Sequence, residues 1–534
     1  MIGLGSWAPL AVLLASFSNA SPVLESIPGN DTFTAQNFTQ VPASPDLQWT
    51  PCYDTYDCAN LIVPLDYNDS DVGTTTVAFI RKNAPGNVTR DILFNPGGPG
   101  GSGVESLLGG TGDLILNITA GLYNAVSFDP RGVSNSGIKL TCFPGDTDAR
   151  DAFWSTFESF TQVSGLNVNY ARGLALGEWC TKANANSTAR YAGTSAVVQD
   201  MMHFSTLQAA ARGYERPEKA LVNYYGVSYG TVIGQTLASL YPDRVGRMIL
   251  DGNENGEEHY QGRKLTAVQD VDKAYEWFFT LCEEAGPEKC AFHADDVKQR
   301  FDALLAKLDE KPVILADPTF SPQSQAPQII TKAVVLTAGF YIMYTPQPGY
   351  PVLARGLAAL ENNDAATFFL ELGPYTQRGA PAQETYILIT AADAAGRSPI
   401  DNLTSFREVF ETVNQTSVYA GRRYALENPL VGAGLKITPP ESQTFKGFQH
   451  TNTSTPILFL NPSADPITPV ANARHMATYF EGAVVLEQNS TGHTVQSMIS
   501  ECTLEWMVRY FVLGQMPEVG TIWLGDYAEL HPTL

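Results

Sequence analysis

The pentapeptide Gly226-Val227-Ser228-Tyr229-Gly230 constrains the fold of this chain more than any other segment. It directly follows the apolar run 220–225 and precedes a helix-compatible stretch, 231–240. A serine at such a strand-to-helix turn sits on strained backbone, with its hydroxyl clear of both elements. The two glycines are needed because a Cβ at either position would collide with the neighbouring strand or helix. An ordinary tight turn that happens to contain a serine is the alternative interpretation.

The bulk composition narrows the class of protein. At 534 residues the chain is too long for one simple domain, and its 44% hydrophobic and 16% charged residues indicate a globular protein. The net charge of −22 argues against nucleic acid or an anionic membrane as a partner. Since no Cys/His cluster has the spacing of a zinc site, we expect no metal, and we expect no other cofactor.

Residues 1–20 have the pattern of a secretory signal peptide. An apolar segment covers 4–17, and Ser18-Asn19-Ala20 supplies small side chains at the cleavage positions. A buried N-terminal helix or an uncleaved anchor is the alternative, although the apolar run is short for a membrane span. We therefore expect a secreted, extracellular protein without stable membrane association.

The density of glycosylation sequons and the pairing of the cysteines are consistent with an exported protein. Asn-x-Ser/Thr sequons are dense along the chain, and we expect several to carry glycan on exposed loops: Asn30, Asn37, Asn68, Asn87, Asn117, Asn186, Asn402, Asn414, Asn452 and Asn489. The seven cysteines fall into three short-range pairs and one remainder, Cys502. In an oxidising compartment we expect these disulfides: Cys52–Cys58, Cys142–Cys180 and Cys282–Cys290.

Continuous apolar runs indicate a mostly parallel sheet flanked by helices, because strands buried on both faces lose the alternating pattern. The strand candidates are 74–81, 91–94, 124–128, 220–225, 246–251, 456–460 and 483–487. Between the strand candidates 246–251 and 456–460, residues 253–452 change to helical periodicity, for example at 271–281 and 297–308. We predict a mostly helical cap inserted after strand 6, with the core divided into 21–252 and 453–534; an independent domain is the alternative.

A nucleophilic serine requires a base and a group that orients the base. His493 lies just past the strand 483–487 and follows a glycine, where a reachable imidazole is expected. Asp465 is the carboxylate in the proline-stiffened loop after the strand 456–460, and Asp251 is the second choice for the acid. The order serine, acid, histidine is that of α/β-hydrolases.

An acyl-transfer reaction also needs N–H donors for the oxyanion. The glycine-rich segment 95–103 follows the strand 91–94 and has neither the Gly-Lys-Ser/Thr nor the dinucleotide spacing that a phosphate-binding loop requires. We predict an oxyanion hole made by the N–H groups of Gly98 and Tyr229.

Together these segments resemble the secreted tripeptidyl-aminopeptidase-like branch of the α/β-hydrolases, related to the prolyl iminopeptidases. The matching segments are 49–52, 58–67, 95–103, 128–132, 224–230, 243–252 and 465–469, with His493 and the region of Cys502. The resemblance implies the triad Ser228, Asp465 and His493 and the oxyanion hole at Gly98 and Tyr229.

Two segments depart from the pattern of the family. Residues 520–523 read Gly-Thr-Ile-Trp where relatives often have Gly-Thr-x-Cys, so Cys502 lacks its usual partner and is expected to be a buried thiol. Residues 389–393 read Ile-Thr-Ala-Ala-Asp where the family has Ile-x-Cys-x-Asp, so the cap is expected to differ in shape.

Three functions fit the predicted site. The first is an aminopeptidase that releases short N-terminal peptides or residues through an acyl-enzyme, with Glu254, Glu257 and Glu258 reading the substrate ammonium. These glutamates are equally consistent with a solvated acidic loop. The second is a carboxylesterase, lactonase or amidase that acts on small molecules such as secondary metabolites. The third is a binding protein that keeps the fold without turnover.

Overall fold

The computed structural model of the protein describes residues 34–154, 165–320, 327–376, 380–498 and 500–524. The predicted signal peptide and the sequon at Asn30 lie outside these residues. Within them, the central element is an 11-stranded sheet with the order β1-β3-β4-β6-β5-β7-β8-β11-β12-β13, and β2 pairs with β3. The strands are β1 (Ala43–Ser44), β2 (Thr50–Cys52), β3 (Tyr56–Asp66), β4 (Asp69–Lys82), β5 (Asp91–Asn95), β6 (Asn124–Asp129), β7 (Val222–Val227), β8 (Val245–Asp251), β11 (Leu458–Ala464), β12 (Val484–Thr491) and β13 (Ile522–Leu524).

The sheet is mostly parallel, as predicted. Strand β4 pairs antiparallel with β3 and β6, whereas the pairs from β6 through β5, β7, β8, β11, β12 and β13 are all parallel. All seven predicted strands are present with shifted ends. Strand β3 was not predicted from the sequence; buried and half-buried residues alternate along it, and it contains Pro64. Such a strand lacks the continuous apolar run that marks the central strands.

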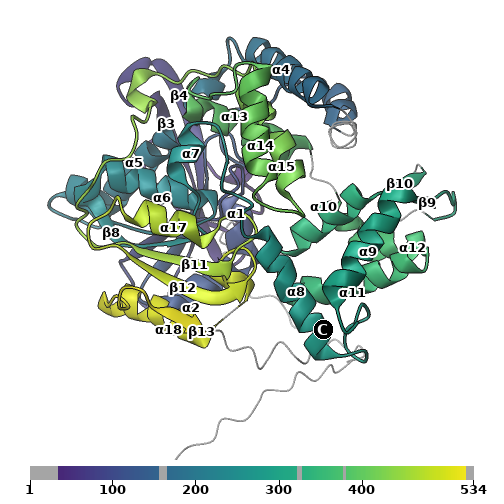
Figure 1. Ribbon diagram of the computed structural model, residues 1–534. Helices are drawn as coiled ribbons and strands as arrows, with labels where there is room; N and C mark the ends of the chain where they lie inside the picture. The colour runs from purple at the N-terminus through teal and green to yellow at the C-terminus, as the bar shows by residue number, and fades with distance from the viewer. Residues whose placement is uncertain (1–33, 155–164, 321–326, 377–379, 499, 525–534) are drawn as a thin grey trace, which may run out of the picture.

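Helices cover both faces of the sheet (Figure 1). One face packs against α5 (Thr194–Ala211), α6 (Tyr229–Leu240) and α17 (Val470–Ala477). The other packs against α1 (Gly103–Ser106), α2 (Gly112–Ile118) and α18 (Glu501–Val508). Because both faces are covered, a strand such as β6 is buried along its whole length.

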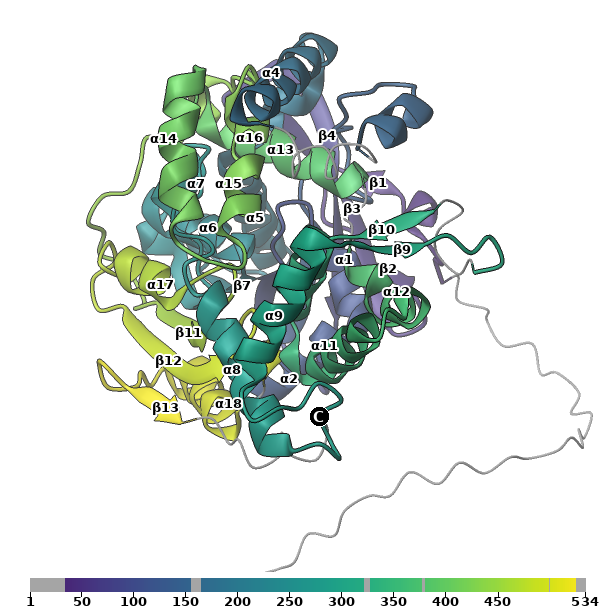
Figure 2. The ribbon, with the colours of Figure 1, turned by 45° about the vertical axis from the view of Figure 1, so that its right-hand side comes forward.

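A helical cap lies between β8 and β11 in the sequence and beside the carboxyl ends of the strands in space (Figures 1 and 2). It has its own hydrophobic core, drawn mainly from residues 268–433. Its elements are α7 (Gly256–Tyr260), α8 (Val271–Ala285), α9 (Val297–Glu310), β9 (Val313–Leu315), β10 (Gln328–Ile330), α10 (Lys332–Ile342), α11 (Pro346–Glu361), α12 (Ala365–Leu372), α13 (Ala380–Ala394), α14 (Leu403–Asn414), α15 (Gly421–Glu427) and α16 (Pro429–Gly432).

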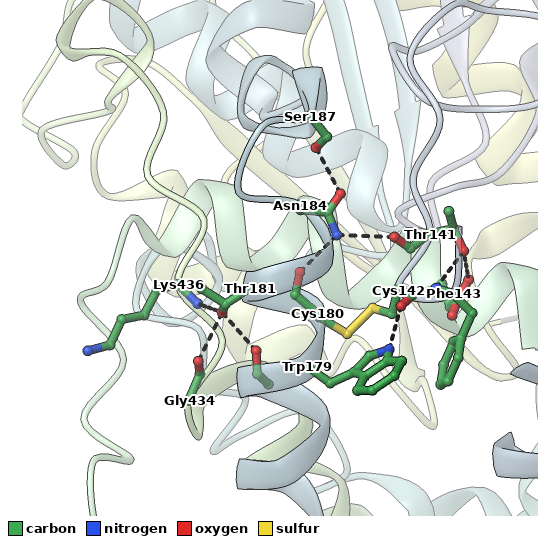
Figure 3. The surroundings of a disulfide bond; sticks show 12 residues. Thr141, Cys142, Phe143, Trp179, Cys180, Thr181, Asn184, Ser187, Gly434 and Lys436 are labelled. Carbon is green, nitrogen blue, oxygen red and sulfur yellow. Dashed lines mark hydrogen bonds between the residues drawn. A yellow bond between two sulfur atoms is a disulfide. The ribbon is translucent and has the colours of Figure 1, made fainter. Parts of the chain in front are cut away.

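A second segment, helix α4 (Leu166–Ala183), joins the cap from the region between β6 and α5. Its residues Leu166, Tyr170 and Leu174 pack against the cap core. Figure 3 shows how its end is attached: the disulfide Cys142–Cys180 ties it to the chain after β6, and the Thr181 hydroxyl donates to the Gly434 carbonyl at 3.0 Å. The place of this helix in the cap was not predicted, because its partners are far away in the sequence.

The three predicted disulfides are all formed: Cys52–Cys58, Cys142–Cys180 and Cys282–Cys290. Cys502 lies on α18 and is half-buried rather than fully buried, which corrects our expectation. In the described part of the chain, no helix has the length and apolar character needed to cross a bilayer.

The described sequons differ in accessibility. Asn489 lies in β12, half-buried and paired with β13, so its environment is unlike the exposed loop that glycosylation requires. The other described sequon asparagines are exposed: Asn37, Asn68, Asn87, Asn117, Asn186, Asn402, Asn414 and Asn452.

Candidate active site

Ser228 occupies the turn between β7 and α6, and its backbone is strained. Its φ of 58° and ψ of −126° lie outside the regions that L-residues normally adopt. A Cβ on Gly226 would lie 2.4 Å from the Gly230 carbonyl oxygen, and one on Gly230 would lie 2.6 Å from the Asn95 carbonyl oxygen. Both glycines are therefore required by close approach of the backbone, as the pentapeptide predicts.

His493 and Asp465 meet at the ends of adjacent parallel strands. Asp465 directly follows β11 and His493 follows β12, so the pairing of these strands brings the two loops together. The His493 Nδ1 atom lies 3.1 Å from each carboxylate oxygen of Asp465. This contact fixes the ring so that Nε2 is the free nitrogen, which is the arrangement that a general base requires.

The carboxylate of Asp465 is fully buried, and hydrogen-bond donors converge on it. The backbone N–H groups of Ile467, Thr468 and Thr494 donate to it at 2.9–3.0 Å. The Thr468 hydroxyl donates at 2.8 Å and lies 3.1 Å from His493 Nδ1. Thr468 was not predicted as a site residue from the sequence. The sequence feature that could have predicted its role is its position three residues after Asp465 in a turn, because a hydroxyl at that position reaches back to the carboxylate.

Asp251, the second choice for the acid, has a different place. It ends β8 and is fully buried, where it accepts hydrogen bonds from the Val495 N–H at 2.9 Å and the Tyr225 hydroxyl at 3.1 Å. Burial raises the pKa of Asp251 to about 7, although these hydrogen bonds and the charge of His493 act in the opposite direction. Among the described residues, the carboxylate that contacts the His493 ring is Asp465, and Asp251 holds the segment that follows the histidine.

The glycine-rich loop after β5 lies against the serine turn. A Cβ on Gly97 would come within 2.8 Å of the Ser228 Cβ and 3.0 Å of the Tyr229 nitrogen. The Gly98 N–H has no hydrogen-bond partner within the described residues, and the Tyr229 N–H, as the first of its helix, has no acceptor within that helix. The loop is anchored by Asp129, which accepts from the Ser102 hydroxyl at 2.6 Å. Both predicted donors are thus beside Ser228.

A cavity of about 240 Å³ joins these groups beneath the cap. Ser228, His493 and Gly98 contribute its core side, together with Glu254. Its cap side is rich in aromatic and cationic residues: Phe340, Tyr341, Tyr344, Tyr386, Arg423 and Tyr424. The cap also touches the histidine itself, because the Tyr344 carbonyl accepts the His493 N–H at 3.0 Å and the two rings meet edge to face at 5.0 Å.

The three glutamates predicted to read a substrate ammonium separate in the structure. Glu254 lines the cavity and forms an ion pair with Lys264 at 3.1 Å. Glu257 lies outside the cavity wall and contacts His475 at 2.6 Å, and Glu258 accepts hydrogen bonds from the backbone of Leu265 and Thr266. Only Glu254 of the three is therefore placed to meet a ligand near Ser228.

The acid limb of the pH–rate profile is expected to lie above the ordinary titration range of histidine. Burial lowers the pKa of His493, but the charge of Asp465 and the hydrogen bond to it, with smaller contributions from Asp251 and Glu254, hold that pKa above its usual 6.5. A general base must be neutral, so kcat/KM should rise with pH through this raised pKa. Measuring kcat/KM across the acidic and neutral range checks this, and a limb centred below the usual histidine value would contradict it.

The strand order and the side chains gathered around this cavity are those of a serine hydrolase on the α/β-hydrolase fold. A family model described as TAP-like protein matches residues 422–522, a segment that contains Asp465 and His493. Among solved structures, a serine hydrolase from Cycloclasticus zankles aligns with 85% of this chain and 98% of its own, at 11% identity and a TM-score of 0.32.

Three curated relatives match along most of the chain. Serine protease Hip1 from Mycobacterium tuberculosis is 24% identical over 501 residues, which cover 89% of this chain and 90% of the relative. Tripeptidyl aminopeptidase from Streptomyces lividans is 23% identical over 485 residues, covering 86% and 82%. Carboxylesterase B from Mycobacterium tuberculosis is 24% identical over 512 residues, covering 89% of each. The chain is thus similar to TAP-like α/β-hydrolases, and it is a serine hydrolase.

Proposed function

We propose that this serine hydrolase is an aminopeptidase that releases short peptides or single residues from the N-termini of its substrates. The observation that carries the proposal is the Glu254 carboxylate in the wall of the cavity that also holds Ser228. Burial would raise the pKa of Glu254, but the charges and hydrogen bonds of Lys264 and His259 lower it to about 2. The lowered pKa keeps Glu254 negatively charged near neutral pH, where it can bind a substrate ammonium.

In the proposed mechanism the Ser228 hydroxyl attacks the scissile carbonyl while His493 accepts its proton. Asp465 keeps the imidazole oriented and stabilises its charged form. The N–H groups of Gly98 and Tyr229 bind the oxyanion. His493 then protonates the leaving amine, and in the second half of the cycle it activates the water that hydrolyses the acyl-enzyme.

The ion pairs in the cavity favour one alternative, a carboxylesterase. Glu254 is already paired with Lys264, and Glu427, which also lines the cavity, lies 3.2 Å from Arg423. A substrate ammonium would have to compete with these cations, whereas a neutral ester would not. The relative named carboxylesterase B is consistent with this alternative.

A substrate comparison separates the two activities. The purified protein is assayed with tripeptide arylamides that have a free or an acetylated N-terminus and with aryl esters of short acids. An aminopeptidase should prefer the free N-terminus by at least about 10-fold in kcat/KM, since one charge-assisted hydrogen bond contributes about 1.5–3 kcal/mol. Glu254→Gln should remove this preference. Ester hydrolysis with equal turnover of free and blocked peptides would instead establish the esterase.

We further propose that the protein is exported and glycosylated. Three disulfides support an oxidising compartment, and exposed sequons such as Asn68 and Asn402 are accessible to glycosylation. A fall in the mass of the natively secreted protein after enzymatic deglycosylation tests the second point, and an unchanged mass contradicts it.

A further inference from the structure

A buried polar junction connects the cap helix α13 to the turn that holds Ser228. Its centre is Asp393, near the end of α13, with 6% of its surface exposed. The carboxylate accepts hydrogen bonds from the Thr194 N–H at 2.6 Å and the Thr194 hydroxyl at 2.5 Å. On its other side the His259 Nε2 lies 2.8 Å away. The four segments that contribute to the junction are α13, α5, α7 and, through Tyr229, α6.

The start of α5 is built around this carboxylate. Its N-cap is Gly193, which has no side chain to satisfy the first N–H groups of the helix, and Asp393 supplies the missing acceptor from the cap. A Cβ on Gly193 would lie 2.9 Å from the Asp393 Oδ1 atom, so a larger residue at this position would displace the carboxylate. An 18-residue helix of the core therefore receives its N-terminal cap from a residue about 200 positions later in the sequence.

The junction continues from Thr194 to the oxyanion hole. The Thr194 hydroxyl lies 2.6 Å from the Tyr229 phenolic oxygen. Because the threonine proton is directed to Asp393, the phenol is the donor in this pair. Burial raises the pKa of Tyr229 far above its ordinary value, so the phenol keeps its proton. Tyr229 is the residue after Ser228, and its backbone N–H is one of the two proposed oxyanion donors.

His259 is the remaining member of the junction and contacts both Asp393 and Tyr229. Its ring lies 5.3 Å from that of Tyr229, and its Nδ1 is 3.7 Å from the Glu254 carboxylate. Burial lowers the pKa of His259, but hydrogen bonds and charges from Asp393 and Glu254 raise it above the ordinary value. His259 lies between the Asp393 and Glu254 carboxylates, and Lys264 forms an ion pair with Glu254, so a proton on His259 would balance the second buried negative charge.

We propose that Asp393 and Thr194 are positioning residues for catalysis, which hold Tyr229 so that its backbone N–H points at the developing oxyanion. Through this chain of hydrogen bonds, the cap helps to build the oxyanion hole besides covering the cavity. The inference rests on the proposed function, since it assumes Ser228 as the nucleophile and the Tyr229 N–H as a donor. A misplacement of about 1 Å can cost roughly 100-fold in rate, so the position of an oxyanion donor matters for its contact with the transition state.

The test uses the rate at which a fluorophosphonate probe labels the full-length protein. Phosphonylation of Ser228 places the P–O⁻ group of the transition state in the oxyanion hole and needs no knowledge of the substrate. Tyr229→Phe removes the phenol oxygen and leaves the backbone N–H. Asp393→Asn weakens the hydrogen bonds at the other end of the series that runs from Asp393 through Thr194 to Tyr229. We expect each variant to be labelled roughly 10-fold more slowly, with a parallel fall in kcat and little change in KM.

The matched control is Tyr123→Phe, which removes another buried phenol whose hydroxyl donates to the Phe511 carbonyl at 3.2 Å, away from the cavity. It should be labelled at the rate of the unmodified protein. The double variant of Tyr229 and Asp393 should be little slower than either single variant, because both substitutions interrupt one chain of contacts.

Two results would overturn the inference. The first is that Tyr229→Phe is labelled at the rate of the unmodified protein. The second is that the variants raise KM while kcat stays unchanged, which would make the junction only an anchor for the cap. If Asp393→Asn does not fold, Tyr229→Phe still decides the outcome. Failure of the proposed aminopeptidase function is recognised separately, because the comparison of free peptides, acetylated peptides and aryl esters on the unmodified protein decides it without the Tyr229 and Asp393 variants.

Discussion

Ser228→Ala is expected to lower kcat by at least about 10⁴-fold, the order of loss seen when a triad nucleophile is removed. The residual rate comes from substrate binding and the oxyanion donors, which the substitution leaves in place. The fold should survive, because the backbone of the turn is held by its own contacts: the Ser228 N–H donates to the Asp251 carbonyl at 3.0 Å. The measurements are turnover of an arylamide or aryl ester and covalent labelling by a fluorophosphonate.

Ser239→Ala is the control for this experiment. Ser239 lies on the same helix, α6, and its hydroxyl donates to the Gln235 carbonyl within that helix, at 2.9 Å. Its activity and labelling should equal those of the unmodified protein. Retention of activity within about 10-fold in Ser228→Ala would assign the nucleophile to another residue.

Asp465→Asn is expected to lower kcat by about 10³–10⁴-fold, because an amide no longer enforces the imidazole tautomer that leaves Nε2 free. It should also reduce the free energy of unfolding by about 1–3 kcal/mol, since the amide NH₂ group would face donors such as the Thr468 and Thr494 N–H groups. Enzyme kinetics measure the first effect, and urea denaturation measures the second.

Asp251→Asn is the matched comparison, because Asp251 is an equally buried carboxyl beside the same loop. It contacts the residues after His493 rather than the ring, so the substitution should cost much less activity than Asp465→Asn. It should also move the acid limb of the pH profile to lower pH, since the charge of Asp251 contributes to the raised pKa of His493. A larger loss in Asp251→Asn than in Asp465→Asn would transfer the role of the acid to Asp251.

The parallel sheet could be predicted from the sequence because its signals are local. Continuous apolar runs identified the seven strands, including β7 and β8, since a strand buried on both faces needs no polar residue. Strand β3 was missed because its alternating pattern and Pro64 are also common outside sheets. Helix α4 could be recognised as part of the cap only in three dimensions, because its partners, such as Gly434, are some 250 residues away.

Part of the candidate site could also be predicted, because its sequence signals are local. Ser228 and His493 are marked by glycines that a particular backbone conformation requires, and those requirements can be read in five or six residues. Glu254, Glu257 and Glu258 occupy nearly the same place in the sequence, yet only Glu254 lines the cavity. Their side chains leave one short segment in different directions, which the sequence does not reveal.

The sequence by itself therefore determined the strand-and-turn units, the cysteine pairs and the residue types needed for acyl transfer, because turn strain and apolar periodicity act within a few residues. Only the tertiary structure decided that Asp465 rather than Asp251 meets His493, and that Asp393 caps a helix of the core beside Tyr229. These pairings depend on which loops the register of the sheet and the packing of the cap bring together, and their contact energies arise only between segments that are distant along the chain.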